Sequence, residues 1–267
     1  MRAVVVLVML TGTAVANPRA LPFTYTTDTL APGQVEVEQY ADLVPLRAMP
    51  PAGGNLTTYL ASEFFTELEI GLADRLELGL YFTLVPNPAD NTIAANDVTE
   101  MPEGNGLKQR LRYIFADPGE WPIDTGVYGE LTENEREIEL EGKILLQRRF
   151  GKLRVASNLW AEYEFYFTGQ RDIVINPTLG ATYEVTRSLH VGVDSWMRGE
   201  YPRNPPPAMR TFALGPEAYV GPAVMNSFGK LWWTVGVYAR VTDAGHTLQP
   251  GEVYGPIWIR SMIGYNI

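Results

Sequence analysis

Residues 63–84 carry a clear alternation of apolar and polar side chains. From Phe64 to Leu72 the apolar side chains fall on even positions, while glutamates occupy odd ones; after residues 73–75 the alternation resumes and runs from Leu76 to Leu84. Successive side chains of a strand point to opposite faces, so each run has one apolar and one polar face. Each run is about ten residues, the length of a tilted strand that crosses a bilayer. The pattern therefore predicts an antiparallel hairpin with a tight turn at 73–75.

Similar alternation recurs along the rest of the chain. It predicts twelve strands, at residues 34–43, 56–72, 76–84, 107–115, 123–132, 137–150, 153–167, 172–185, 189–201, 212–225, 230–241 and 253–267. The fold class expected from this pattern is all-β and antiparallel.

The lengths of the connections also alternate. Tight turns follow the second, fourth, sixth, eighth and tenth strands, whereas most connections after the first, third, ninth and eleventh are longer, up to residues 85–105. Short periplasmic turns and longer outer loops are typical of bacterial outer-membrane barrels. A soluble β-sandwich would alternate too, but it would not need uncharged outward faces over a dozen strands. We therefore expect residues 34–267 to form a transmembrane antiparallel β-barrel of about 12 strands, with short periplasmic turns and longer extracellular loops.

The N-terminus indicates that the chain is exported, as an outer-membrane protein must be. Met1 and Arg2 precede a short apolar run, and Ala14-Val15-Ala16 forms a small-residue cleavage site, so residues 1–16 read as a secretory signal peptide. Residues 17–33 hold three prolines and are expected to be an extended periplasmic lead-in. The predicted localisation is the bacterial outer membrane, with membrane lipid around the barrel.

Composition narrows the function. The formal charge is -10, and it becomes -11 on loss of residues 1–16, which contain one arginine and no acid. This balance argues against nucleic acid, which needs a basic footprint. The chain has no cysteine, so its stability rests on packing and barrel closure rather than on disulfides.

If the apolar side chains of each strand face lipid, the polar side chains that alternate with them fill the lumen. A basic ladder at Lys108, Arg110 and Arg112 would face acidic sectors that include residues 36–77 and 137–141. The candidate solute-contacting residues are Lys108, Arg110, Arg112, Tyr128, Glu130, Arg154, Arg198, Arg240, Arg260, Glu67, Glu69 and Glu77. The register of the hairpin around the 117–122 turn predicts that Arg110 lies near Tyr128 and Glu130.

These lumen charges have two interpretations. Opposed charged walls can set the selectivity of a pore. Alternatively, the charges satisfy one another in a plugged lumen, since twelve strands lie between small filled barrels and wide porins. Glu69 and Glu77 should lie close across the first hairpin, where they would share a proton or cation, or be balanced by an arginine from another strand.

Two segments resemble a known family. Residues 23–33 (FTYTTDTLAPG) leading into 35–40, and residues 71–79 (GLADRLELG), are similar to bacterial outer-membrane barrels labelled transporter-like, or MetA-pathway of phenol degradation. The closing residues 264–267 resemble the C-terminal signal read by the barrel-assembly machinery, although Ile267 stands where an aromatic residue is usual. The resemblance implies an outer-membrane barrel that takes up small, aromatic or apolar, molecules. It carries over no binding-residue motif.

The function expected is therefore an outer-membrane channel or facilitated-diffusion transporter for small molecules. The alternatives are a barrel-embedded lipid-modifying enzyme and a non-conducting structural or partner-binding barrel. An enzyme is not expected, because neither His190 nor His246 has a serine at suggestive spacing. No cofactor and no metal site is predicted. Solute identity, gating and oligomeric state do not follow from the pattern.

Overall fold

The computed structural model describes residues 17–48, 57–84, 106–203, 216–242 and 254–267. Its elements are β1 (Val35–Ala48), β2 (Thr57–Ala73), β3 (Leu76–Leu84), β4 (Gly106–Ile114), β5 (Asp124–Asn134), β6 (Glu137–Phe150), β7 (Leu153–Tyr166), β8 (Arg171–Ile175), β9 (Thr178–Glu184), β10 (Leu189–Pro202), β11 (Glu217–Phe228), β12 (Leu231–Arg240) and β13 (Ile257–Asn266). The predicted signal peptide lies outside the described residues. Within them, no helix is long and apolar enough to cross a membrane.

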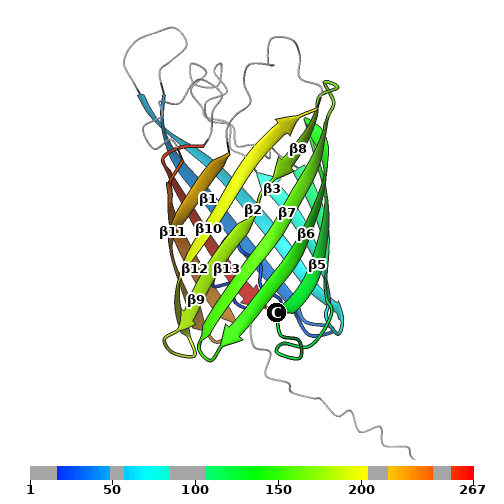
Figure 1. The fold of residues 1–267 in the computed structure, drawn as a ribbon, viewed down its shortest axis with the longest axis vertical. Coiled ribbons are helices and arrows are strands. Elements are labelled where there is room, and N and C mark those ends of the chain that lie inside the picture. Colours follow the sequence, from blue (N-terminus) through cyan, green and yellow to red (C-terminus); the bar gives the residue numbers. More distant parts are fainter. Residues whose placement is uncertain (1–16, 49–56, 85–105, 204–215, 243–253) are drawn as a thin grey trace, which may run out of the picture.

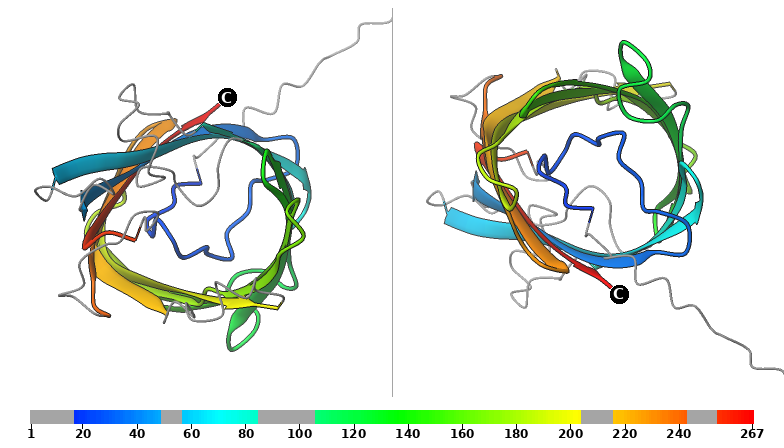
Figure 2. Two further views of the ribbon diagram at one scale, coloured as in Figure 1. Left: turned by 90° about the horizontal axis from the view of Figure 1, so that it is seen from above. Right: turned by 90° about the horizontal axis from the view of Figure 1, so that it is seen from below.

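The strands close into one antiparallel barrel (Figures 1 and 2). Apart from β8 and β9, each strand pairs with its sequence neighbours, and β1 pairs with β13 to close the ring. β8 and β9 both lie between β7 and β10, so they form one position in the wall. The barrel therefore has twelve strands, as the alternation predicts.

One predicted strand, residues 172–185, is interrupted. It divides into β8 and β9 at Asn176 and Pro177, because proline has no N–H for the ladder. The register against β7 is the same on both sides of the break, where Ala161 pairs with Ile175 and Asn158 with Thr178. The interruption thus shifts no side chain to the other face, and backbone hydrogen bonds continue beside it, from Asn176 N to Trp160 O and from Met197 N to Pro177 O.

Tight turns join the strands at the end of the barrel where both described termini lie (Figure 1). Arg75 makes the β2–β3 turn with a φ of 65°, and Gly151 and Gly229 adopt the same left-handed region in the β6–β7 and β11–β12 turns. Residues 115–123 form the longer β4–β5 connection at this end.

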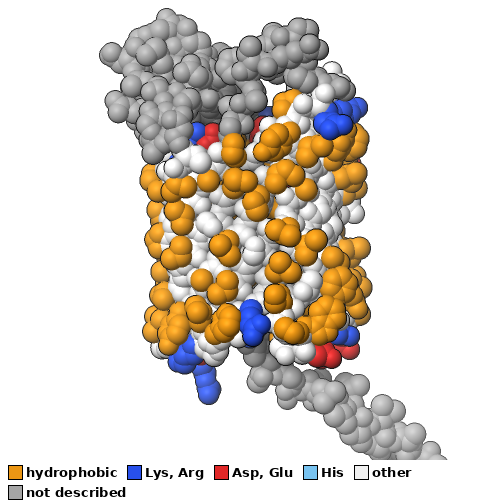
Figure 3. All heavy atoms as spheres, in the orientation of Figure 1, with side chains coloured by type: hydrophobic (Ala, Val, Ile, Leu, Met, Phe, Trp, Pro, Cys, Tyr) orange, Lys and Arg blue, Asp and Glu red, His pale blue; other side chains and the backbone are white. Residues whose placement is uncertain are grey.

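The outer wall is apolar and the inner wall is charged. Phe82 is 65% exposed and Leu159 is 53% exposed, whereas Glu67 and Glu77 are fully buried. Figure 3 shows hydrophobic side chains over the strands, with charged groups gathered towards the two ends of that face. Such a band of exposed apolar side chains on a closed barrel is the lipid-facing surface of an outer-membrane protein. The fold and location are therefore those of a bacterial outer-membrane β-barrel.

Residues 17–33, here called the N-terminal segment, were expected as a lead-in on the periplasmic side. The segment is extended, but it lies inside the barrel (Figure 2). Leu21, Thr24 and Thr27 are each at most 2% exposed. An unpaired extended segment leaves backbone groups that need partners, and the polar inner wall supplies them.

Side chains of at least six strands hold the N-terminal segment, from β1, β3, β6, β7, β10 and β12. Asp194 on β10 accepts hydrogen bonds from Phe23 N (2.8 Å) and Thr24 Oγ1 (2.6 Å). Asn158 on β7 binds both backbone groups of Tyr25, at 2.7 and 2.9 Å. Further contacts run from Leu30 N to Glu77 on β3 (2.9 Å) and from Thr234 Oγ1 on β12 to Arg19 O (2.6 Å). The segment therefore fills the lumen in the half nearer the tight turns.

Candidate functional site

A cavity of about 100 Å³ lies in the lumen against the N-terminal segment. Phe23 and Tyr25 of that segment form part of its lining, and side chains from the strands form the rest. The strands and loops contribute Tyr40, Asp42, Glu63, Phe65, Tyr81, Lys108, Tyr128, Glu130, Glu141, Lys143, Trp160, Asn176, Trp196, Arg198, Tyr254, Trp258 and Arg260. Ten of these nineteen lining residues are aromatic, so the cavity offers more flat apolar surface than a water-filled pore requires.

The aromatic side chains pack into a continuous cluster on the β10–β13 side. Trp196 stacks on Tyr219 with ring centroids 4.3 Å apart, and on Phe23 at 4.9 Å. Trp258 meets Trp196 edge-on at 5.1 Å, and Tyr254 stacks on Trp258 at 6.2 Å. Both geometries are preferred for aromatic pairs. A planar apolar solute in the cavity would extend this stack.

The charged groups of the cavity are paired with one another. Lys108 Nζ lies 3.7 Å from Glu130 Oε1, and Lys143 Nζ lies 2.6 Å from Glu141 Oε1. Lys143 also lies 3.6 Å from the Trp160 ring centroid, so an ammonium is already held against an aromatic face.

Arginines on the β10–β13 side are neutralised in the same way. Arg260 Nε donates to Asp42 Oδ1 at 2.7 Å, and Arg198 pairs with Glu162, Glu164 and Glu200. Beside Arg198, burial raises the pKa of the Tyr254 phenol well above its ordinary value. Tyr254 therefore remains a neutral donor, and its hydroxyl lies 3.3 Å from Glu200 Oε1.

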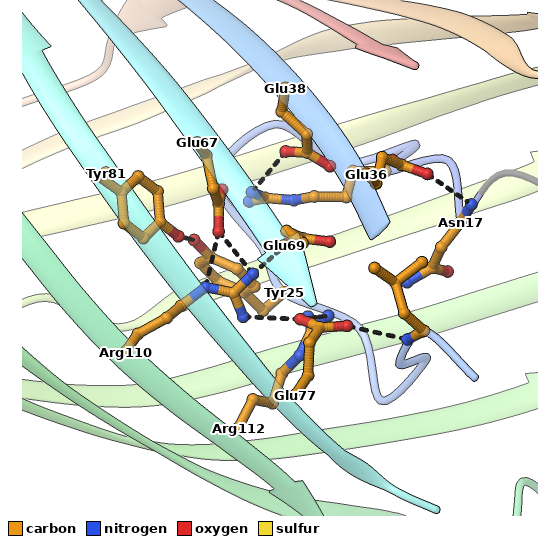
Figure 4. Close-up of polar contacts among 12 residues, drawn as sticks. Asn17, Tyr25, Glu36, Glu38, Glu67, Glu69, Glu77, Tyr81, Arg110 and Arg112 are labelled. Carbon is orange, nitrogen blue, oxygen red and sulfur yellow. Dashed lines mark hydrogen bonds and ion pairs between the residues drawn. The ribbon is translucent and has the colours of Figure 1, made fainter. Parts of the chain in front are cut away.

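A second charged group lies nearer the tight turns and outside the cavity lining. Arg110 pairs with Glu67, with Glu69, and with Glu77, whose Oε1 lies 2.9 Å from Arg110 Nη1 (Figure 4). Arg112 Nη2 donates to the same Glu77 oxygen at 2.6 Å. Both arginines are only 1% exposed. Gly79 on β3 leaves the space in which the Arg110 side chain lies, because a Cβ there would overlap it.

The arrangement fits the predicted balancing of Glu69 and Glu77 by an arginine from another strand. The predicted register also holds, since Arg110 pairs with Glu130 and Arg112 with Tyr128 across β4–β5. The basic ladder is thus divided. Lys108 reaches the cavity, whereas Arg110 and Arg112 form ion pairs with glutamates of β2 and β3.

The remaining predicted lumen residues are dispersed. Five of the twelve line the cavity: Lys108, Tyr128, Glu130, Arg198 and Arg260. Arg154 instead pairs with Asp28 of the N-terminal segment at 2.6 Å, and Arg240 pairs with Glu217. Within the described chain, the Nδ1 atom of His190 on β10 is buried without a hydrogen-bond partner. His246 lies outside the described residues.

Sequence reasoning missed the aromatic cluster and the N-terminal segment as parts of one site. Trp196 and Trp258 occupy the inward parity of their strands, where polar residues were expected. The sequence did offer one indication: Phe23 and Tyr25 lie among the prolines of residues 18–32, and a segment exposed to solvent does not need such aromatic side chains.

No protein-family model and no curated protein matches the chain. Solved structures do. The COG4313 outer membrane channel from Pseudomonas putida F1 aligns with a TM-score of 0.59 and 12% identity, over 90% of this chain and 98% of that one. The NanC porin aligns with a TM-score of 0.53 and 11% identity, over 87% of this chain and 100% of that one. At these identities the likeness shows a shared barrel fold.

Proposed function

We propose that the protein is an outer-membrane channel or facilitated-diffusion transporter for small molecules, and that its preferred solutes are aromatic or apolar. The aromatic cavity inside a closed, lipid-facing barrel carries this proposal. Two further observations support it. The structures of similar fold are named as a channel and a porin. Residues 23–40 and 71–79 resemble the MetA-pathway barrels.

The chemistry of the cavity favours apolar over ionic solutes. Stacking against an aromatic ring contributes about 0.5–1.5 kcal/mol beyond burial. The cations that face the cavity already have carboxylate partners, so a small anion would have to compete with Glu130, Glu141 or Asp42. A neutral aromatic solute displaces water without breaking these pairs.

Leucine in place of Trp258 should weaken uptake of a neutral aromatic probe such as toluene, while leaving the barrel folded. Trp258 is 5% exposed and belongs to the cluster, so its loss removes a stacking surface of the cavity. The measurement is the rate of toluene entry into proteoliposomes that contain the refolded chain. We expect a several-fold lower rate for Trp258→Leu.

Trp233→Leu is the matched control. Trp233 faces outward and is 49% exposed, so the same substitution there should leave the rate unchanged. Equal rates for the two variants and the unaltered protein would contradict a solute path through the cavity.

A non-conducting barrel is the second candidate, and the filled lumen favours it. Single-channel recording in planar bilayers separates the two functions when the N-terminal segment is loosened. A barrel that conducts only after loosening supports the transporter, and one that admits neither ions nor toluene in any variant supports the structural role.

A further inference from the structure

Asn17, at the start of the N-terminal segment, lies against a buried carboxylate. Its backbone nitrogen donates to Glu36 Oε2 on β1 at 3.2 Å (Figure 4). The side chain of Asn17 binds its own segment instead, where Nδ2 donates to Asp28 O at 3.4 Å. Glu36 is fully buried. The first residue of the segment is therefore fixed to the inner wall through its backbone nitrogen.

Glu36 belongs to a group of three buried glutamates, here called the glutamate triad. One carboxylate oxygen each from Glu36, Glu38 and Glu69 lie within 4.8 Å of one another. Carboxylates this close oppose one another's ionisation unless cations lie beside them. Each member of the glutamate triad therefore needs a positive partner in order to keep its charge in the lumen.

Two members of the glutamate triad have such a partner. Arg19 Nη1 of the N-terminal segment lies 3.7 Å from Glu38 Oε2, and Arg110 on β4 forms an ion pair with Glu69. Both arginines are buried with their glutamates. The N-terminal segment thus already supplies one cation to the glutamate triad.

Glu36 is the member whose contacts are with neutral groups. Its Oε1 accepts from the Trp232 indole nitrogen at 2.6 Å, and its Oε2 accepts from the Asn17 nitrogen. Within the part of the chain that the structure describes, no arginine or lysine side chain pairs with Glu36. A buried charge without a counter-charge is strongly destabilising. The contact with Asn17 is the place where a counter-charge would act directly on this carboxylate.

The same nitrogen lies at the bond where the sequence predicts that the chain is cut. Ala14-Val15-Ala16 is the cleavage site of the predicted signal peptide. Hydrolysis of the Ala16–Asn17 peptide bond by a signal peptidase adds the hydroxyl of water to the Ala16 carbonyl carbon and a proton to the Asn17 nitrogen. The resulting α-amino group takes up a second proton near neutral pH, since the ordinary pKa of such a group is about 7.7–8.0. Cleavage therefore replaces a neutral amide with a cation opposite Glu36.

We propose that the α-ammonium group of Asn17, formed when the signal peptide is removed, is the counter-ion of Glu36, and that this ion pair fastens the start of the N-terminal segment in the lumen. Only cleavage between Ala16 and Asn17 places the ammonium at the nitrogen that contacts Glu36. A cut one residue earlier would move it about 3.8 Å along the chain, and a cut one residue later would remove that nitrogen. The ion pair depends on the terminus of the mature chain and on no solute.

The mass of the chain isolated from outer membranes gives the first test. We expect a mature protein whose first residue is Asn17 and whose terminal amine is free. A mature chain that begins at any other residue, or whose terminal amine is acylated, overturns the proposal.

The reactivity of the terminal amine tests the ion pair itself. Acylation requires the unprotonated amine, so a carboxylate that holds the ammonium form slows the reaction. The folded mature chain in detergent is treated with the N-hydroxysuccinimide ester of acetic acid, and modified peptides are quantified by mass spectrometry. We expect the Asn17 amine to react about tenfold faster in Glu36→Gln, which corresponds to about 1.4 kcal/mol in favour of the charged form. Lys152, exposed in a turn, is the internal reference and should react equally in both chains.

Glu133→Gln is the matched control, because Glu133 is exposed on the outer face of β5. It should leave the reactivity of the Asn17 amine unchanged. If Glu36→Gln does not give a heat-modifiable barrel, a chain that keeps Ala16 as its first residue moves the amine away from Glu36 and leaves the barrel residues intact. Its terminal amine should also react about tenfold faster. Equal rates in the unaltered chain, in Glu133→Gln and in either test chain overturn the proposal. None of these results bears on toluene entry.

Discussion

Replacing Arg110 with methionine is expected to lower the free energy of unfolding by about 3–5 kcal/mol, the range for breaking a buried ion pair from one side. The guanidinium contacts Glu67, Glu69 and Glu77, none of which is more than 1% exposed. Methionine fills a similar volume, so the loss is electrostatic rather than a cavity. The glutamates would then have to take up protons or admit water. Urea unfolding in detergent micelles, followed by heat-modifiable gel mobility, measures the change.

Two further variants identify the cause. Arg148→Met removes an arginine at an exposed position of β6, where the side chain donates to Pro122 O and lies 5.2 Å from the Phe150 ring centroid, and should change stability by less than about 1 kcal/mol. Adding Glu67→Gln and Glu69→Gln to Arg110→Met should restore part of the lost stability, because the uncompensated charges are gone. If the single variant Arg110→Met were as stable as the unaltered chain, water would already screen the charges of Glu67, Glu69 and Glu77, and the prediction would be wrong.

The positions of the strands could be predicted from the sequence because, in a strand with one apolar and one polar face, the two kinds of side chain alternate residue by residue. β3 and β6 have the predicted bounds, and the β4–β5 register brings Arg110 opposite Glu130 as expected. Hairpin partners are close in sequence, so the turn fixes their pairing. The break at Asn176 and Pro177 escaped prediction because alternation continues through it, although the proline itself was visible.

The interior could be predicted only where its partners are neighbours in sequence. Arg260 pairs with Asp42 across the closing β13–β1 seam, a contact between residues that no turn connects. In the sequence, Trp196 and Trp258 interrupt the series of polar, inward-facing residues. Only closure of the barrel brings the two side chains together with Phe23. Residues 17–33 have neither helical nor strand periodicity, so their position depends on hydrogen bonds, an ion pair and ring contacts with distant strands.

Loosening the N-terminal segment is expected to raise single-channel conductance several-fold. In the double variant Asn158→Ala and Asp194→Ala, the segment loses four hydrogen bonds made by Phe23, Thr24 and Tyr25. At about 0.5–1.5 kcal/mol each, these bonds together hold the segment by about 2–6 kcal/mol. A loss of that size shifts the ratio of occluded to open lumen by more than tenfold, since each 1.4 kcal/mol is a factor of ten.

The control for the loosened lumen is Ser195→Ala, because Ser195 follows Asp194 but bonds outward to Leu179 O. Its conductance should match that of the unaltered barrel. Tyr25 makes separate contacts with the barrel wall, because its hydroxyl lies 3.0 Å from the Tyr81 hydroxyl and the Lys143 ammonium lies 4.6 Å from its ring centroid. If the double variant stays closed, adding Tyr25→Ala removes these contacts as well. A barrel that remains silent after all three changes would contradict the expectation that these contacts decide whether the segment occludes the lumen, because the contacts of Leu30 N with Glu77 and of Asp28 with Arg154 remain in that variant.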